Sequence, residues 1–490
     1  MSPSRRHGGF ALTDEQNHAV DLALTGEDLR IEAYAGAGKT STLAAMAREL
    51  PGRGMYLAFN KAIAMEARSA FPRAVDCRTA HSLAYRAGGY AYKNQLGMRI
   101  PGSQVAQVMG LQDDDILTAA SQGGFLLDWM RVFTFSDDEQ PELRHAPTRS
   151  YLKVLPDEES RLGYAELLLD SARLMWRKMA DPDDDTIPAT HDTYLKGWAL
   201  FGPRIEADYI LFDEAQDANP IMLQIVGGQN AQRIYVGDRF QQIYSWRGAK
   251  NAMQEIETAS RCVLSQSFRF GQPVADVAMR ILKDHAGHEV RIKGTPGIES
   301  RIGRVDKADT VLCRTNGKLL EYIGPHMEQG DVVAVTGGTT EVVNLVKGLK
   351  QLRFGHRSFH PELASFASWD DVMEYASSEV GRDLSVAVGL ITRMKWSDLD
   401  DLLRRLEACD DEDPRHPADI VVSTAHKAKG RQWDSVKLAD DFKSPGDKNW
   451  HPEEANLLYV AATRAKHELD LTDCPAAMWS PELPTSGKPD

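Results

Sequence analysis

Three features are scarce in this sequence of 490 residues: cysteine, long apolar runs and an excess of positive charge. The few cysteines form no close pair, which argues against a zinc-ligand cluster and against a disulfide framework. They stand at positions 77, 262, 313, 409 and 474. No apolar run reaches the length of a membrane span, and the first ten residues lack the apolar segment of a secretion signal. We therefore expect a protein of a reducing compartment, the cytoplasm, that is not embedded in a membrane.

The net charge of −14 argues against a protein whose whole surface binds nucleic acid. A local basic groove remains compatible with it, because binding depends on where Lys and Arg cluster. The length predicts two to four domains, and a hydrophobic content of 42% supplies more than one core.

Short apolar runs recur along the chain and alternate with expected helices, such as 40–50, which Pro51 ends. The runs are 29–33, 55–59, 209–212, 234–236, 310–313 and 420–423. This pattern predicts an α/β fold with parallel sheets covered by helices on both faces. Ligands of such sheets bind at the carboxyl ends of the strands, where several of these runs meet polar residues. Two stretches without the pattern, roughly 88–190 and 317–417, look mainly helical and are expected to be inserted domains.

The segment AYAGAGKT, residues 33–40, lies between an expected strand and an expected helix, where a phosphate-binding loop must lie. Backbone N–H groups and a helix N-terminus form an anion cradle there. Lys39 would neutralise the β- and γ-phosphates, and the Thr40 hydroxyl would ligate Mg²⁺. The rest of the expected nucleotide-binding loop is Ala35, Gly36, Ala37, Gly38 and Ser41. The general pattern has glycine where this chain has Ala33, and the alternative is a glycine-rich turn with an exposed lysine.

The segment DEAQD, residues 213–217, follows the apolar run 209–212. Asp213 would lie at the end of a strand and hold Mg²⁺ through water. Glu214 would orient and deprotonate the attacking water. The alternative is a charged turn after a buried strand, and the phosphate loop upstream favours the functional interpretation.

Gln16 has two interpretations that the residues leave open. With Thr13 it has the spacing of a capping box, so it is expected to bond the backbone at the start of a helix. Alternatively, its amide grips an adenine.

Further segments resemble the motifs of superfamily 1 helicases of the UvrD/Rep/PcrA branch, and all of them occur in that family's order. AFNKAIA (58–64) and TAHSLAY (79–85) resemble its two early DNA motifs. VGDRFQQIYSWRGA (236–249), LSQSFRF (264–270), STAHKAKGRQW (423–433) and NLLYVAATRAK (456–466) resemble its third to sixth motifs. HDTYLKGW (191–198) and ADDF (439–442) look closest to the F-box DNA helicases.

The resemblance implies two RecA-like P-loop NTPase cores, each with a mainly helical inserted domain. The first core is expected at 1–87 and 197–258, with the insertion at 88–196. The second core is expected at 259–316 and 418–479, with a small insertion at 317–417 and a flexible tail at 480–490.

By the same resemblance, ATP binds in a cleft between the cores. Gln241 matches the glutamine that senses the γ-phosphate, while Arg269 and Arg464 match arginines that stabilise the transferring phosphoryl group. Phe268 matches an aromatic that stacks on adenine. Gln432 stands where many relatives have a glutamate near the ribose, and Ser41 where several have an arginine.

The resemblance also implies contacts to DNA, which a basic groove and stacking aromatic side chains provide. Without the motif, Trp246 would be interpreted as a core tryptophan, and the two histidines as structural. The matching residues are Phe59, Asn60, Lys61, His81, Tyr244, Trp246, Arg247 and His426.

The expected function is an ATP- and Mg²⁺-dependent DNA helicase that moves along single-stranded DNA, with the family precedent of 3′ to 5′ travel, in repair, recombination or replication. The first alternative is a translocase that mainly strips proteins such as recombinase filaments. Others are a non-hydrolysing nucleic-acid-binding module and an RNA motor.

Expected partners are single strands, single-to-double-strand junctions, and a recombinase or single-strand-binding protein. A monomer or weak dimer is expected, at the nucleoid or in the host cytoplasm for a virus. An F-box partner is not expected, because the motor begins near residue 12.

Overall fold

The computed structural model describes residues 5–7, 10–98, 100–152, 155–243, 252–358, 360, 363, 366, 368–377, 382–407, 409, 418–447 and 450–477. The chain forms two compact units, Met1–Ser265 and Gln266–Asp490. In the described residues, no helix has both the length and the apolar character needed to cross a membrane.

The first unit is built on a parallel sheet of six strands in the order β5-β4-β6-β7-β3-β8. The strands are β3 (Leu29–Ala33), β4 (Gly54–Leu57), β5 (Val75–Arg78), β6 (Tyr209–Phe212), β7 (Gln232–Gly237) and β8 (Ser260–Leu264). Along β6, Tyr209 and Leu211 belong to one core and Ile210 and Phe212 to another. A strand buried on both faces is a near-continuous apolar run, which is why β6 stands out in the sequence.

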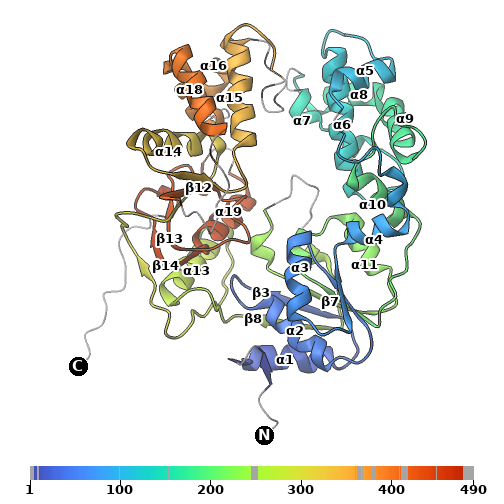
Figure 1. The fold of residues 1–490 in the computed structure, drawn as a ribbon, viewed down its shortest axis with the longest axis vertical. Coiled ribbons are helices and arrows are strands. Elements are labelled where there is room, and N and C mark those ends of the chain that lie inside the picture. Colours follow the sequence, from blue (N-terminus) through green and yellow to red (C-terminus); the bar gives the residue numbers. More distant parts are fainter. Residues whose placement is uncertain are drawn as a thin grey trace. The chain divides into compact units, whose positions relative to one another are not determined.

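Helices cover both faces of this sheet (Figure 1). One core includes residues of α1 (Asp14–Ala23), α2 (Lys39–Glu49) and α3 (Lys61–Ala70). The other includes residues of α11 (Pro220–Gly227) and α12 (Ala252–Glu255). The predicted α/β class with parallel sheets is therefore confirmed.

The stretch expected to be a helical insertion in the first unit is helical in the residues described. After α4 (Ala80–Ala87) it contains α5 (Gly102–Met109), α6 (Ala119–Phe135), α7 (Thr148–Tyr151), α8 (Glu158–Leu167), α9 (Leu169–Ala180) and α10 (His191–Leu200). Its own core gathers aromatic side chains such as Phe125, Trp129 and Phe133. The expected boundary at residue 196 falls inside α10, whose Tyr194 and Leu195 pack with α4 and α11.

The second unit has a second parallel sheet of six strands, in the order β11-β12-β10-β13-β14-β9. The strands are β9 (Arg301–Ile302), β10 (Thr310–Cys313), β11 (Val333–Val335), β12 (Ile420–Thr424), β13 (Trp433–Leu438) and β14 (Ala465–Asp470). The helices are α13 (Gln272–Ala286), α14 (Asn316–Gln329), α15 (Thr340–Arg353), α16 (Trp369–Ser377), α17 (Arg382–Arg393), α18 (Trp396–Glu407) and α19 (Pro452–Ala462).

Two expected boundaries are wrong. Residues 260–264 were assigned to the second core, but they form β8, which pairs with β3 in the first sheet. The second insertion was expected to begin at residue 317, but β11 at 333–335 pairs with β12 in the second sheet. Both are strands at a sheet edge, paired on one side in the described residues. β8 alternates in burial, and β11 is only three residues long.

Candidate functional site

The expected phosphate loop links the carboxyl end of β3 to the start of α2. Gly36 and Gly38 have φ values of 75° and 73°, a left-handed conformation that glycine adopts without steric cost. Gly38 caps α2 without a side-chain hydrogen bond. Ala33 is the last residue of β3 and has no positive φ, which explains why alanine can replace glycine there. The backbone thus forms the turn that a phosphate cradle requires.

Lys39 and Glu214 meet directly beside this loop. The Lys39 ammonium lies 2.8 Å from Glu214 Oε1 and donates to Oε2 at 2.9 Å. Burial alone would lower the pKa of Lys39, but the carboxylates of Glu214, Asp213 and Asp238 raise it. Lys39 is therefore a firmly charged group at the loop, and an incoming phosphate would compete with Glu214 for it.

Asp213 is a buried carboxylate at the carboxyl end of β6. Its Oδ2 accepts from the Tyr56 hydroxyl at 2.7 Å, and its Oδ1 accepts from the Glu214 N–H at 2.9 Å. Burial and the Glu214 charge raise the pKa of Asp213, while Lys39 opposes this. The half-buried Thr40 hydroxyl and this carboxylate are hard oxygen donors, which suits Mg²⁺, since that ion usually takes one or two carboxylates and keeps several waters. The donor set thus fits the expected magnesium ion.

A chain of hydrogen bonds runs from Glu214 to the segment after β7. Gln216 Nε2 donates to Glu214 Oε2 at 2.5 Å, and Gln216 Oε1 accepts from the Asp238 N–H at 3.0 Å. Asp238 Oδ2 in turn accepts from Gln241 Nε2 at 2.6 Å. The structure therefore places the expected base and the expected γ-phosphate sensor at the two ends of one network.

Gln216 and Asp238 are not among the residues predicted from the sequence, although they lie in the segments DEAQD and VGDRFQQIYSWRGA. Asp238 is fully buried, and its side chain caps the short turn Arg239–Gln241. Gly237 lies against Gln216, because a Cβ at that position would come within 2.4 Å of Gln216 Oε1. The sequence feature that could have identified Asp238 is the Gly-Asp pair directly after an apolar run.

Gln16 forms the capping box that the sequence predicted. Its Oε1 accepts from the Thr13 N–H at 3.0 Å, and its own N–H donates to Thr13 Oγ1. Its Nε2 donates to Thr42 Oγ1 at 3.0 Å, on α2. The capping interpretation is confirmed, and the contact with α2 places Gln16 beside the helix that begins at the phosphate loop.

A cavity of about 480 Å³ joins the acidic pair to two residues of the expected DNA motifs. Asp213 and Glu214 line it together with Phe59 and His81. Phe59 is 46% exposed, a large aromatic surface open to a ligand. His81 Nε2 lies 2.9 Å from Asp192 Oδ1 on α10.

The neighbouring Asn60 and Lys61 lie at the start of α3, where the Asn60 Oδ1 accepts from the Ile63 N–H at 2.9 Å. Asn60 is thus a helix cap, a structural role that its motif did not reveal. Lys61 is exposed.

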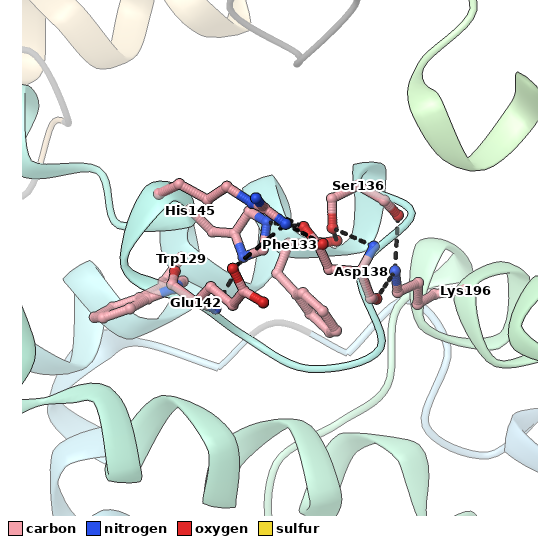
Figure 2. Close-up of polar contacts among 8 residues, drawn as sticks. Trp129, Phe133, Ser136, Asp138, Glu142, His145 and Lys196 are labelled. Atoms are coloured by element: carbon pink, nitrogen blue, oxygen red, sulfur yellow. Dashed lines mark hydrogen bonds and ion pairs between the residues drawn. The ribbon is translucent and has the colours of Figure 1, made fainter. Parts of the chain in front are cut away.

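The helical insertion contributes Arg131 and Phe135 of α6 to the same cavity. Lys196 of α10 is fully buried and contacts the end of α6 (Figure 2). Its ammonium donates to the carbonyl oxygens of Ser136, at 2.7 Å, and Asp138, and lies 4.6 Å from the centre of the Phe133 ring. This contact fixes the helix that carries Arg131 and Phe135.

The two expected arginines of the second unit, Arg269 and Arg464, lie close to each other. Arg269 Nη1 donates to the Thr463 carbonyl at 3.0 Å, and its Nε donates to Gln432 Oε1 at 2.9 Å. Arg464 is buried, and its Nε donates to the Val460 carbonyl at 2.8 Å. Three predicted residues from three motifs thus come together within this unit.

Phe268 is 48% exposed in the second unit, in keeping with a stacking surface. His426 is partly buried, and burial lowers its pKa. The expected DNA contacts Tyr244, Trp246 and Arg247 and the expected tail 480–490 lie outside the described residues.

Two family models match the chain. Residues 157–259 match the UvrD/REP helicase N-terminal domain, and residues 419–472 match the UvrD-like helicase C-terminal domain. Both the N-terminal and the C-terminal domain model of UvrD-like helicases are matched in the chain, in that order. The resemblance seen in the sequence is therefore confirmed, and the two parallel sheets are consistent with the RecA-like cores of such helicases.

Individual helicases are similar over nearly the whole chain. F-box DNA helicase protein 1 of Schizosaccharomyces pombe is 30% identical over 96% of this chain and 58% of its own length. F-box DNA helicase 1 of Gallus gallus is 31% identical over 93% of this chain and 48% of its own length. A probable DNA helicase II homolog of Mycoplasma capricolum is 32% identical over 17% of this chain and 12% of its own length. The chain spans about half the length of the two F-box helicases.

Proposed function

We propose that this chain is an ATP-dependent translocase on single-stranded DNA that unwinds duplexes in the 3′ to 5′ direction. The observation that carries the proposal is the network from Lys39 through Glu214, Gln216 and Asp238 to Gln241. It connects a phosphate loop, an acidic pair and the Arg239–Gln241 turn (the glutamine turn). These are the parts that ATP hydrolysis needs.

The nucleotide chemistry follows from these positions. The loop N–H groups and Lys39 would bind the phosphates, and Thr40 and Asp213 would hold Mg²⁺, which neutralises phosphate charge when bound. Lys39 would turn from Glu214 to the phosphates, and this exchange frees the carboxylate. Glu214 would then orient the attacking water and accept its proton. Arg269 and Arg464 would stabilise charge on the transferring phosphoryl group.

The DNA side of the proposal rests on the cavity beside the acidic pair. Phe59 would stack on a base, because stacking on an exposed aromatic ring is independent of sequence. Glu214 also lines this cavity, so a bound DNA strand would change the surroundings of the expected base. Both F-box relatives are named DNA helicases, which supports DNA rather than RNA as the substrate.

The direct test is strand displacement on duplexes with a 3′ or a 5′ single-stranded tail, with ATP and Mg²⁺. We expect displacement on the 3′-tailed substrate and none by the Lys39→Ala variant. Displacement on the 5′-tailed substrate alone would contradict the proposed polarity, and displacement without ATP would contradict the proposed function. A filament-clearing assay on the same tails tests the alternative function: rapid clearing with no displacement would favour protein stripping.

A further inference from the structure

Glu32 is an acidic residue on an interior strand of the first sheet. Its strand, β3, pairs with β7 on one side and β8 on the other, and Glu32 stands opposite Gly237 and Val263. The alternate residues of the strand, Leu29 and Ile31, are fully buried apolar side chains. A partly buried carboxylate needs hydrogen-bond partners to offset lost hydration. Glu32 immediately precedes the phosphate-loop segment 33–40, and the proposed chemistry of hydrolysis does not use it.

The partner of Glu32 lies at the start of the glutamine turn. The Oε1 of Glu32 accepts from the Arg239 N–H at 3.0 Å. The next two residues of the turn are held by Asp238, which accepts from the Phe240 N–H at 3.1 Å and from Gln241 Nε2 at 2.6 Å. Glu32 thus links the strand that leads into the phosphate loop to the turn that ends at Gln241.

The charged surroundings of Glu32 make this link costly. Burial and the nearby Asp238 raise the pKa of Glu32 to about 7, while the bond from the Arg239 N–H and the charges of Arg239 and Arg30 act in the opposite direction. Tyr34, whose own pKa burial and Glu32 raise, faces the same region. Two carboxyl groups held close together at the cost of hydration destabilise the fold, and such arrangements gather at functional sites.

We propose that Glu32 is a positioning residue for Gln241: its carboxyl group anchors the Arg239–Gln241 turn to the strand before the phosphate loop. This contact keeps the side-chain amide of Gln241 in position to contact the bound phosphates. The inference rests on the proposed function, because it assumes that Gln241 contacts the γ-phosphate.

The test compares Glu32→Gln and Glu32→Leu for kcat and KM of ATP hydrolysis in the presence of single-stranded DNA. Gln keeps an acceptor oxygen, whereas Leu keeps the bulk and removes the acceptor. We expect Leu to lower kcat about tenfold with KM for ATP within about twofold of wild type, and Gln to retain most of kcat. We also expect an inflection in wild-type kcat near pH 7 that Glu32→Gln lacks. Glu206→Gln is the control, since the Glu206 side chain is 89% exposed.

Equal kcat values for the Gln and Leu variants, whether normal or reduced, would overturn the proposal. If Glu32→Leu does not fold, the pH profile of Glu32→Gln decides: an inflection like that of wild type overturns the role. A wild-type protein without ATP hydrolysis would instead contradict the proposed function itself, so the two failures are distinguishable.

Discussion

Glu214 adopts a backbone conformation that costs free energy. Among the non-glycine residues described, it is the one with a positive φ, 54°, and it is the second residue after β6. A non-glycine residue in this region is disfavoured by about 1–3 kcal/mol, and such strain gathers at functional sites. The bonds to Lys39 and Gln216 hold the carboxylate in this position. This geometry supports the proposed role of Glu214 as the base.

Replacing Glu214 with glutamine tests that role. The amide keeps an oxygen for Lys39 but cannot accept the proton of the attacking water. We expect ATP binding to remain and steady-state turnover to fall roughly 10²–10⁴-fold, the usual contribution of a general base. Nucleotide binding measured beside turnover separates the two effects. Normal hydrolysis by Glu214→Gln would assign the base to another residue.

Gly237 tests the packing of the network. A Cβ at this position would lie 2.4 Å from Gln216 Oε1 and 3.1 Å from Met253 Cγ, so Gly237→Ala should displace Gln216. We expect a loss of about 1–3 kcal/mol in the free energy of unfolding and reduced ATP turnover. Gly163→Ala in α8 is the matched control, because a Cβ there meets no atom within 4 Å. Denaturant unfolding of both variants would show the difference, and equal stability would mean that Gln216 moves freely.

Glu32 gives stability a defined dependence on pH. Its pKa is about 7 in the folded chain, above its ordinary value of 4.5. Between these values the unfolded chain has released the proton and the folded chain has not, so stability falls as the pH rises to about 7 and then levels off. Glu32→Gln removes this loss. We expect the free energy of unfolding of the variant relative to wild type to increase from pH 5 to pH 8, by an amount on the order of 1–3 kcal/mol. A constant difference would contradict the assignment.

At the scale of elements, Lys196 joins the helical insertion to α10. Its ammonium is the donor to two carbonyl groups just after α6, and burial lowers its pKa to about 8. Beside it, the buried His145 bonds Asp138 at 2.8 Å and accepts from the Glu142 N–H at 3.0 Å (Figure 2). The loop after α6 is therefore ordered by polar contacts as well as by its apolar core.

Truncating Lys196 should loosen this connection. Lys196→Ala leaves buried carbonyl groups without their donor, each at a cost of about 1–3 kcal/mol. We expect a lower free energy of unfolding and faster hydrogen exchange in the loop 136–146. Arg53→Ala is the control, because its ion pair with Glu206 is 4.0 Å long and exposed, and such pairs contribute about 0–1 kcal/mol. Similar losses for the two variants would show that the Lys196 contact is dispensable.

The elements also show how far the sequence could predict the fold. The runs at 29–33, 209–212 and 310–313 have the observed bounds of their strands. The last two are buried throughout, whereas 29–33 alternates, with Arg30 and Glu32 less buried than their neighbours. The edge strand β8 was assigned to the wrong core, because its residues alternate in burial and its pairing partner is 231 residues away in sequence, as for Ser260 and Leu29.

The residues of the candidate site also divide into those that the sequence could predict and those that it could not. Lys39, Asp213 and Glu214 were predicted from residue types that suit phosphate and magnesium, and Gln241 from the family resemblance; the structure joins them in one hydrogen-bond network. Glu32 and Lys196 could not be predicted, because their partners are a backbone N–H and backbone carbonyls of distant segments. Such contacts depend on tertiary structure, and the side chain alone gives no signal for them.

At the scale of the whole molecule, the proposed nucleotide site and the cavity proposed to bind a strand are joined through residues of the first unit. The second unit contributes Arg269, Gln432 and Arg464, gathered at one place. A shift of Gln241 at the phosphate would be transmitted through Asp238 and Gln216 to Glu214, which lines the cavity. Such coupling needs a network that both ligands can bias.

The rate of ATP hydrolysis by the wild-type chain with Mg²⁺, measured with and without saturating single-stranded DNA, tests this claim most directly. The account predicts slow hydrolysis by the free protein and a rise of at least about tenfold when the strand binds. The strand-binding signal, followed by fluorescence anisotropy of a labelled oligonucleotide, verifies saturation. Hydrolysis at one rate with and without bound DNA would contradict the coupling, and with it the account of this chain as a DNA motor.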